Sequence, residues 1–176
     1  AQIQINTLKS LINKAKKTKF GIEHQFHKIS SVEEYIDQVP VRDYEDINKY
    51  IDEIKKGIKD ILWPGKPKYL AKTSGTTSGA KYIPITNESM PNHILSSRNA
   101  LLFYIYETGD TSFLNGKTIF LQGSPVLDEI NGILIGRLSG IVAHHIPSYL
   151  RKNNLPSVKT NSIEDWEKKV NEICKE

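Results

Sequence analysis

The stretch KYLAKTSGTTSGAKYIPIT, residues 68–86, decides how the fold of this chain is interpreted. It places seven consecutive Ser, Thr and Gly residues, Thr73 to Gly79, between two short apolar segments. Both segments have the length and composition of β-strands, and Pro84 in the second predicts an edge strand or a bulge. The run between them is either a flexible linker or a loop that binds a ligand.

Flexible linkers are the ordinary interpretation of a Ser/Thr/Gly run. This run is short and directly joins two strands, so we expect a connection inside a domain. Backbone N–H groups in a Gly-containing turn form an anion-binding nest, and Lys72 and Lys81 flank the run. Its hydroxyl side chains are those of Thr73, Ser74, Thr76, Thr77 and Ser78. The pattern favours a loop that binds phosphate.

Two common phosphate-binding motifs do not match the run. A Walker A loop has Gly-Lys-Ser/Thr before a helix, whereas Gly79 precedes Ala80, Lys81 and Tyr82 in a predicted strand. The run does not fit GxGxxG either. Because no helix N-terminus follows, loop amides and hydroxyls must supply the donors.

Length and composition indicate one domain of ordinary globular character. The chain has 176 residues, of which 38% are hydrophobic and 25% charged, with a formal charge of +4. The basic residues are interspersed with acidic ones, which argues against a nucleic-acid partner. One cysteine, Cys174, excludes an internal disulfide and favours a reducing, cytoplasmic setting. We see no membrane span, no secretory signal and no metal-ligand spacing.

Hydrophobic periodicity predicts helices over 3–21, 30–40 and 43–58 before the loop and over 87–107 after it. A Ser cap is expected for the second helix, and Asp43 is expected to cap the third. Because ALLFYIYE, residues 100–107, is apolar nearly all round, we expect burial on most sides. GKTIFLQGS, residues 116–124, predicts a buried strand, and residues 162–173 predict a helix with a Ser162/Asp165 capping box. Residues 125–150 give no clear period.

TSGTTSGAKYIPIT resembles the first phosphate-binding motif of adenylate-forming enzymes. Further phrases resemble, in order, the N-terminal region of the plant auxin-responsive, or Gretchen Hagen 3, acyl-acid amido synthetases and their bacterial relatives. They are FGIEHQFHKI, VPVRDYEDINKYIDEIKKG, LWPGKPKYLAKTSGTTSG, FLNGKTIFLQGS, GRLSGIVAHHIP and IEDWEKKV. The resemblance implies an α/β fold, with N-terminal helices packed on a mixed β-sheet within the large N-terminal domain of such an enzyme.

In that family ATP adenylates a carboxylic acid, and an amine such as an amino acid then takes the acyl group. The resemblance therefore implies ATP and Mg²⁺ as cofactors of the complete enzyme and small-molecule acid and amine partners. The phosphate contacts would be Ser74, Gly75, Thr76, Thr77, Ser78 and Gly79, with Lys81 beside them. The acyl substrate would lie against the helix after the loop, at Arg98, Phe103 and Tyr104. Residues 1–176 match only the N-terminal part, so we expect a single domain or fragment that is inactive alone.

Other candidates favour structural roles. His144 and His145, if extended, point to opposite faces and do not chelate one metal. His24 and His27 lack further ligands, and we expect Cys174 to be a buried or incidental thiol. Asp128 and Glu129 are expected to be solvated. Two other functions stay open: a non-enzymatic nucleotide- or anion-binding domain, and a protein-interaction domain with a Ser/Thr/Gly linker.

Overall fold

The computed structural model describes residues 2–73, 79–147, 151 and 153–176 and divides into two compact units. Unit 1 consists of Ala1–Lys68 and Ile130–Ile133, and unit 2 of Tyr69–Glu129 and Leu134–Glu176. Helices together with a mixed sheet confirm the predicted α/β class.

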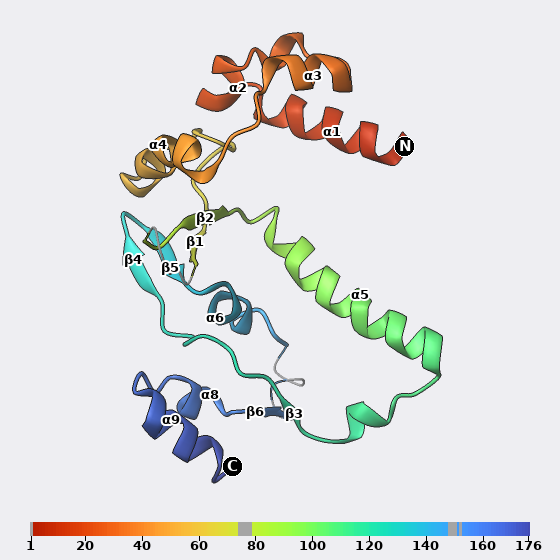
Figure 1. Cartoon of the computed structure of the whole chain (residues 1–176), viewed down its shortest axis with the longest axis vertical. Coiled ribbons are helices and arrows are strands. Elements are labelled where there is room, and N and C mark those ends of the chain that lie inside the picture. Colours follow the sequence, from red (N-terminus) through yellow and green to blue (C-terminus); the bar gives the residue numbers. More distant parts are fainter. Residues whose placement is uncertain (1, 74–78, 148–150, 152) are drawn as a thin grey trace. The chain divides into compact units, whose positions relative to one another are not determined.

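Unit 1 is helical among its described residues (Figure 1). Its elements are α1 (Gln2–Ala15), α2 (Lys19–Glu23), the 3₁₀ turn η1 (Phe26–Lys28), α3 (Val32–Gln38) and α4 (Tyr44–Lys55). Their buried residues Ile12, Ala15 and Phe26 form a core with the half-buried rings of Phe20 and Tyr35 packed against it. The amphipathic pattern therefore predicted the helical character of this unit.

The first predicted helix is wrong in extent, because the chain turns after Ala15. Thr18 caps a second helix, α2, by accepting a hydrogen bond from Gly21 N at 3.0 Å. Gly21 was expected to end the first helix but lies inside α2, where an added Cβ would stand 2.1 Å from Ala15 O. Close contact between backbones, not helix termination, explains this glycine.

The predicted caps of the next two helices are confirmed. Ser31 forms a capping box with Glu34 at the start of α3, and Asp43 accepts a hydrogen bond from Asp46 N at the start of α4. The predicted stripe of α4 is buried at Ile51 and Ile54, whereas Ile58 follows the helix and is exposed.

Unit 2 combines the sheet with helices. The elements that lie in it wholly or largely are β1 (Tyr69–Lys72), β2 (Tyr82–Ile85), α5 (Met90–Thr108), η2 (Ser112–Asn115), β3 (Thr118–Ile119), β4 (Asp128–Ile130), β5 (Ile133–Gly136), α6 (Leu138–Ala143), β6 (Asn154–Leu155), α8 (Val158–Asn161) and α9 (Trp166–Ile173). The strand order is β2-β1-β5-β4, and β3 and β6 form a separate parallel pair. β2 is an edge strand, as Pro84 predicted, because an edge tolerates the missing N–H.

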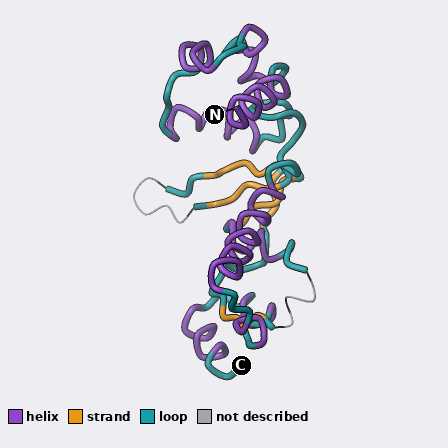
Figure 2. The backbone as a smooth tube through the Cα atoms, turned by 90° about the vertical axis from the view of Figure 1, so that its right-hand side faces the viewer, coloured by secondary structure: helices purple, strands orange, loops and turns teal. Residues whose placement is uncertain are grey.

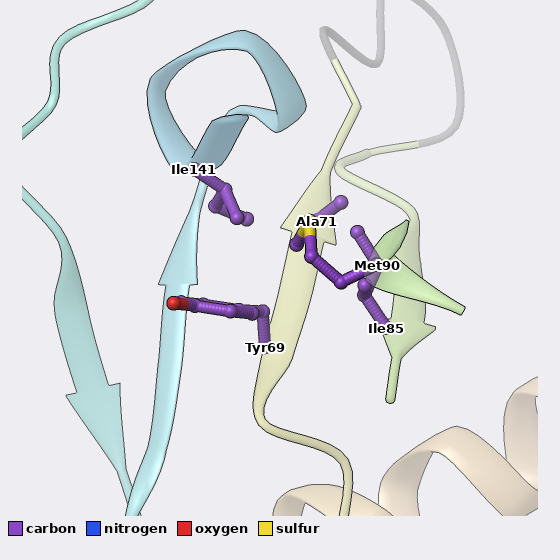
Figure 3. Close-up of a cluster of buried hydrophobic side chains, with 5 residues drawn as sticks. All are labelled: Tyr69, Ala71, Ile85, Met90 and Ile141. Atoms are coloured by element: carbon purple, nitrogen blue, oxygen red, sulfur yellow. The ribbon is translucent and has the colours of Figure 1, made fainter. Parts of the chain in front are cut away.

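The buried cluster of unit 2 covers one face of this sheet. Tyr69 and Ala71 of β1 point to that face with Ile85 of β2, and Met90 of α5 and Ile141 of α6 pack on them (Figure 3). Leu70, between them on the opposite face, has no exposed surface. β1 is thus buried on both faces, which explains its continuous apolar run.

Two burial predictions for unit 2 are wrong. The second half of α5 is exposed, with Leu102 at 53% and Phe103 at 64%, and the strand at β3 is exposed, with Phe120 at 50%. Apolar composition states a preference for burial, but burial also needs a partner surface. Within the described part of the chain, no helix has the length and apolarity needed to cross a membrane.

The last helix also begins differently from the prediction. Asp165 alone caps α9, accepting a hydrogen bond from Lys168 N at 2.7 Å. Ser162 instead ends α8 and donates its hydroxyl to Val158 O. Trp166 in the predicted apolar face is 64% exposed.

Candidate functional site

The Ser/Thr/Gly run joins strands β1 and β2, as predicted, and the structure pairs the two strands as an antiparallel hairpin. Figure 2 shows the two strands side by side, and their register pairs Lys72 with Tyr82. Thr73 N donates to Lys81 O at 2.9 Å, and Lys81 N donates to Thr73 Oγ1 at 3.2 Å. The first hydroxyl of the run therefore fixes the base of the loop.

Most of the predicted phosphate contacts, namely Ser74, Gly75, Thr76, Thr77 and Ser78, lie outside the described residues. Gly79 is described and exposed, with φ +81° and open space where a Cβ would stand. A left-handed backbone favours glycine even without steric contact. The chain therefore leaves the loop through a turn that leaves backbone atoms accessible.

The hairpin opens at the edge of the sheet where parallel strands end. β1 and β5 are parallel, with Ala71 paired to Gly136, so both strands reach their carboxyl ends at the same edge. The loop follows β1 there, and Arg137 with α6 follows β5. Ligands of open α/β sheets bind outside the carboxyl ends of the strands.

The sequence and the strand register place three cationic side chains at this edge of the sheet. Lys72 and Arg137 are exposed, and Lys81 is half-buried. Arg137 was missed at the sequence level, because residues 125–150 were not assigned to elements. The signal was available: ILIG, a buried strand pattern, is followed directly by Arg137.

A close backbone contact fixes α6 beside this edge. An added Cβ at Gly140 would lie 2.2 Å from Ser124 O. Gly123 N donates to Ser139 Oγ at 2.9 Å, which ties the same segment to the first turn of α6. The position of Arg137 at the start of α6 is therefore set by packing of two backbone segments.

The predicted acyl-substrate residues lie on α5 and are exposed. Arg98 Nη2 donates to Asn99 Oδ1 at 3.4 Å, and the Phe103 side chain is 64% exposed. The ring of Tyr104 packs edge-to-face on Phe113 with centroids 5.6 Å apart, and its hydroxyl donates to Asp110. Hydrogen bonds from Ser112 lower the pKa of the Asp110 carboxyl, so it stays ionised near Tyr104.

The histidine pair adopts a different conformation from the predicted extended one. His144 is the C-cap of α6, in helical conformation, and its Nε2 lies 2.6 Å from Pro125 O. His145 Nε2 shares a hydrogen bond of 3.1 Å with the Tyr69 hydroxyl, and the two rings meet edge-to-face. Both side chains link α6 to neighbouring segments, which supports the structural interpretation.

The remaining candidates each have their own local surroundings. His24 is buried, and its ring stacks on Phe20. Its Nε2 lies 2.8 Å from Arg42 Nη2. Cys174 is exposed rather than buried. Asp128 and Glu129 are exposed in β4, as expected for solvated acids. Among the described residues no group of three or more His, Cys, Asp or Glu side chains could hold a metal ion.

Helices together with the mixed sheet make this an α/β domain, and comparison with known proteins defines its family. The family model described as GH3 family N-terminal domain matches residues 1–173. The chain belongs to the GH3 family, which confirms the resemblance found in the sequence.

Individual relatives agree with this assignment. The indole-3-acetic acid-amido synthetase GH3.15 of Arabidopsis thaliana is 33% identical over a match of 114 residues; the match covers 61% of this chain and 18% of the relative. A solved structure of GH3.15 acyl acid amido synthetase matches 93% of this chain and 29% of its own, with a TM-score of 0.71 and 24% identity. A second, of AtGH3.15 acyl acid amido synthetase in complex with 2,4-DB, matches 87% of this chain and 26% of its own, with a TM-score of 0.66 and 25% identity. The chain spans less than a third of the length of each of these relatives.

Proposed function

We propose that this chain is the ATP-phosphate-binding part of an acyl acid amido synthetase. The observation that carries the proposal is the β1–β2 hairpin, which opens at the carboxyl end of the parallel pair β1 and β5. Membership of the GH3 family and the amido synthetase names of its relatives support it. In this proposal residues 1–176 form the N-terminal part of the adenylate-forming domain.

The proposed reaction has two steps. A carboxylate oxygen of the acid attacks the α-phosphorus of ATP, giving an acyl-adenylate and pyrophosphate. The nitrogen of an amine then attacks the acyl carbon, giving an amide and AMP and releasing a proton. The relative that was solved with 2,4-DB supports a small organic acid as the acyl substrate.

The loop would stabilise the leaving pyrophosphate in the first step. Amides and hydroxyls of Ser74 to Gly79 donate to the β- and γ-phosphate oxygens, which gain charge as the bond to the α-phosphorus breaks. Lys72, Lys81 and Arg137 add positive charge at the same edge of the sheet. Preorganised donors act here without the reorganisation that water requires.

The hairpin residues would not bind Mg²⁺ directly; the phosphates of the nucleotide would bind the ion. The hairpin offers amides, hydroxyls and cations, whereas Mg²⁺ prefers carboxylate and phosphate oxygens. We propose that the phosphates carry the ion and that other parts of a GH3 enzyme supply its protein ligands. Three exposed side chains of α5 would form one wall of a pocket for the acyl substrate: Arg98, Phe103 and Tyr104. Because they are exposed, other residues can form the opposite wall.

Calorimetric titration tests the proposal. Pyrophosphate and Mg·ATP are added to the wild-type chain, to the triple variant Ser74→Ala/Thr76→Ala/Thr77→Ala, and to a control that loses the exposed α5 hydroxyls, Ser96→Ala/Ser97→Ala. We expect binding by wild type and control and at least a tenfold loss of affinity in the loop variant. If all three proteins bind with equal affinity, or if none of them gives a heat of binding, the phosphate-binding proposal is wrong and the run is a linker.

A second assay tests whether these 176 residues are sufficient for adenylation. The 176 residues alone are expected to give no ATP–pyrophosphate exchange with any acid, because the remaining parts of the site are supplied elsewhere. Measurable exchange would show that this chain completes adenylation by itself.

A further inference from the structure

Unit 1 contains a cavity that has no part in the proposed reaction. It lies between α1 and the 3₁₀ turn η1, which pack together, and residues that follow these two elements complete its lining. Its volume is about 380 Å³. Small-molecule sites in proteins have volumes of roughly 300–1,000 Å³, so the cavity is large enough for a small ligand.

The buried part of the lining is apolar. Ile12 and Phe26 are 5% and 7% exposed and belong to the core of unit 1, and Ile29 packs against that core. The Phe26 ring is held edge-to-face against Phe20, with centroids 5.8 Å apart. Because core side chains keep their positions without a ligand, an apolar group can be buried on them with little ordering cost.

The exposed part of the lining is polar and basic. Lys9 and Asn13 lie one turn apart on the same face of α1, and Lys16 follows the end of this helix. Lys16 Nζ donates to Asn13 Oδ1 at 2.7 Å, which holds the ammonium group beside the cavity. His27 and Ser30 line the cavity from the side of η1. The aliphatic stems of the lysines add apolar surface below their charged groups.

The charge around the cavity favours an anion. Among the described residues that line it there are two lysines and no Asp or Glu. An acid does contact the lining, because Glu34 accepts hydrogen bonds from Ser30 N at 2.6 Å and from Ser30 Oγ at 2.8 Å. That carboxylate is engaged in the capping box of α3, and the two ammonium groups outnumber it.

We propose that this cavity binds a small organic acid, with its apolar body on Ile12, Phe26 and Ile29 and its carboxylate at Lys9 and Lys16. An ammonium group forms charge-assisted hydrogen bonds with a carboxylate, and the apolar surroundings strengthen this attraction relative to open water. An inorganic anion would leave the apolar surface uncovered. The limited volume favours an acid with a single aromatic ring or a short chain over a nucleotide.

The proposed site uses side chains of unit 1 alone. Its residues differ from those proposed to contact the acyl substrate on α5, and the inference does not depend on ATP binding by the loop between β1 and β2. It also gives His27, which the proposed reaction does not use, a place beside a ligand.

Amide chemical shifts of the chain during titration with 4-phenylbutanoate test the proposal. We expect saturable shifts at Asn13, Phe26, Ile29 and Ser30. Three further probes separate the two parts of the ligand: 4-phenylbutanamide keeps the ring without the charge, acetate keeps the carboxylate without the ring, and inorganic phosphate is an anion without an apolar body. Each of the three should bind at least tenfold more weakly than 4-phenylbutanoate.

Two double variants locate the carboxylate. Lys9→Gln/Lys16→Gln should weaken 4-phenylbutanoate binding at least fivefold and leave the weak binding of 4-phenylbutanamide unchanged. Lys17→Gln/Lys28→Gln removes the same charge from neighbouring positions outside the lining, so it should bind as wild type does. All four lysines are exposed, so we expect both variants to fold.

Three results would overturn the proposal. The first is the absence of saturable shifts at the lining residues, and the second is equal affinity for 4-phenylbutanoate and inorganic phosphate. The third is equal affinity of the two double variants for 4-phenylbutanoate, which would mean that only the overall charge of unit 1 matters. The Ser74→Ala/Thr76→Ala/Thr77→Ala variant should bind 4-phenylbutanoate as wild type does, so failure of phosphate binding by the loop is distinguishable from failure of this site.

Discussion

Gly140 illustrates how single residues position the candidate site. A methyl group there would lie 2.2 Å from Ser124 O, a backbone atom that cannot rotate away. Gly116 is a matched contrast, since it has φ −107° and open space around its Cβ direction.

Gly140→Ala should therefore lower the free energy of unfolding by about 1–3 kcal/mol, the range of overpacking in a tight contact. Gly116→Ala should change it by less than about 0.5 kcal/mol. Urea unfolding of both variants measures the difference. Equal stabilities would show that α6 and residues 123–124 do not pack as closely as described.

The carboxyl of Glu23 makes unit 1 sensitive to acid. Its hydrogen bond from the Tyr50 hydroxyl lowers its pKa below the ordinary value of 4.5. A group whose pKa is lower in the folded state contributes stability above its unfolded pKa and loses that contribution as pH falls through the folded pKa.

We expect wild type to be more stable than Glu23→Gln at pH 7 and the difference to shrink below about pH 4.5, in line with the linkage of proton binding to unfolding. Thermal unfolding between pH 3 and 7 provides the measurement. Tyr50→Phe should remove the same pH dependence, because it removes the donor. A difference that stays constant with pH would contradict this assignment.

At the level of elements, helix starts were predictable where a side chain caps its own helix. Ser31 and Asp43 were identified because their signals are local, within three residues of the amide they bind. The start of α9 was less clear, because Ser162 and Asp165 both fit a capping box in the sequence. The structure separates their roles: Asp165 caps α9 and Ser162 ends α8.

Asp165→Ala is expected to reduce the free energy of unfolding by about 1 kcal/mol, the usual effect of losing an N-cap. Ser162→Ala should have the smaller effect, since its hydroxyl donates only to Val158 O, a helix carbonyl. Chemical denaturation of the two variants compares them. A larger loss in Ser162→Ala would restore the capping box that the sequence predicted.

Burial was the property of elements that sequence could not determine. The apolar pattern correctly gave α5 as a helix and β1 as a strand, but α5 and β3 are exposed where the same reasoning predicted a core. Periodicity describes which faces are apolar, whereas burial depends on what lies opposite each face.

For the whole molecule, the two strands on either side of the loop and the family could be predicted from the sequence, because local chemistry and motif order indicate them. The parallel pairing of β1 with β5 could not, because it joins residues more than 60 positions apart and residues 125–150 have no clear period. Arg137 was missed for that reason. Its place at the carboxyl end of β5 depends on this pairing.

The central claim, that the loop between β1 and β2 binds phosphate, is tested most directly by amide chemical shifts of the chain during titration with pyrophosphate. The account predicts saturable shifts at Thr73 and Gly79–Lys81 and in the loop between them, with a smaller response at Arg137. These shifts should disappear in the Ser74→Ala/Thr76→Ala/Thr77→Ala variant. Absence of shifts at the hairpin, or shifts confined to the lysines of α1, would contradict the claim.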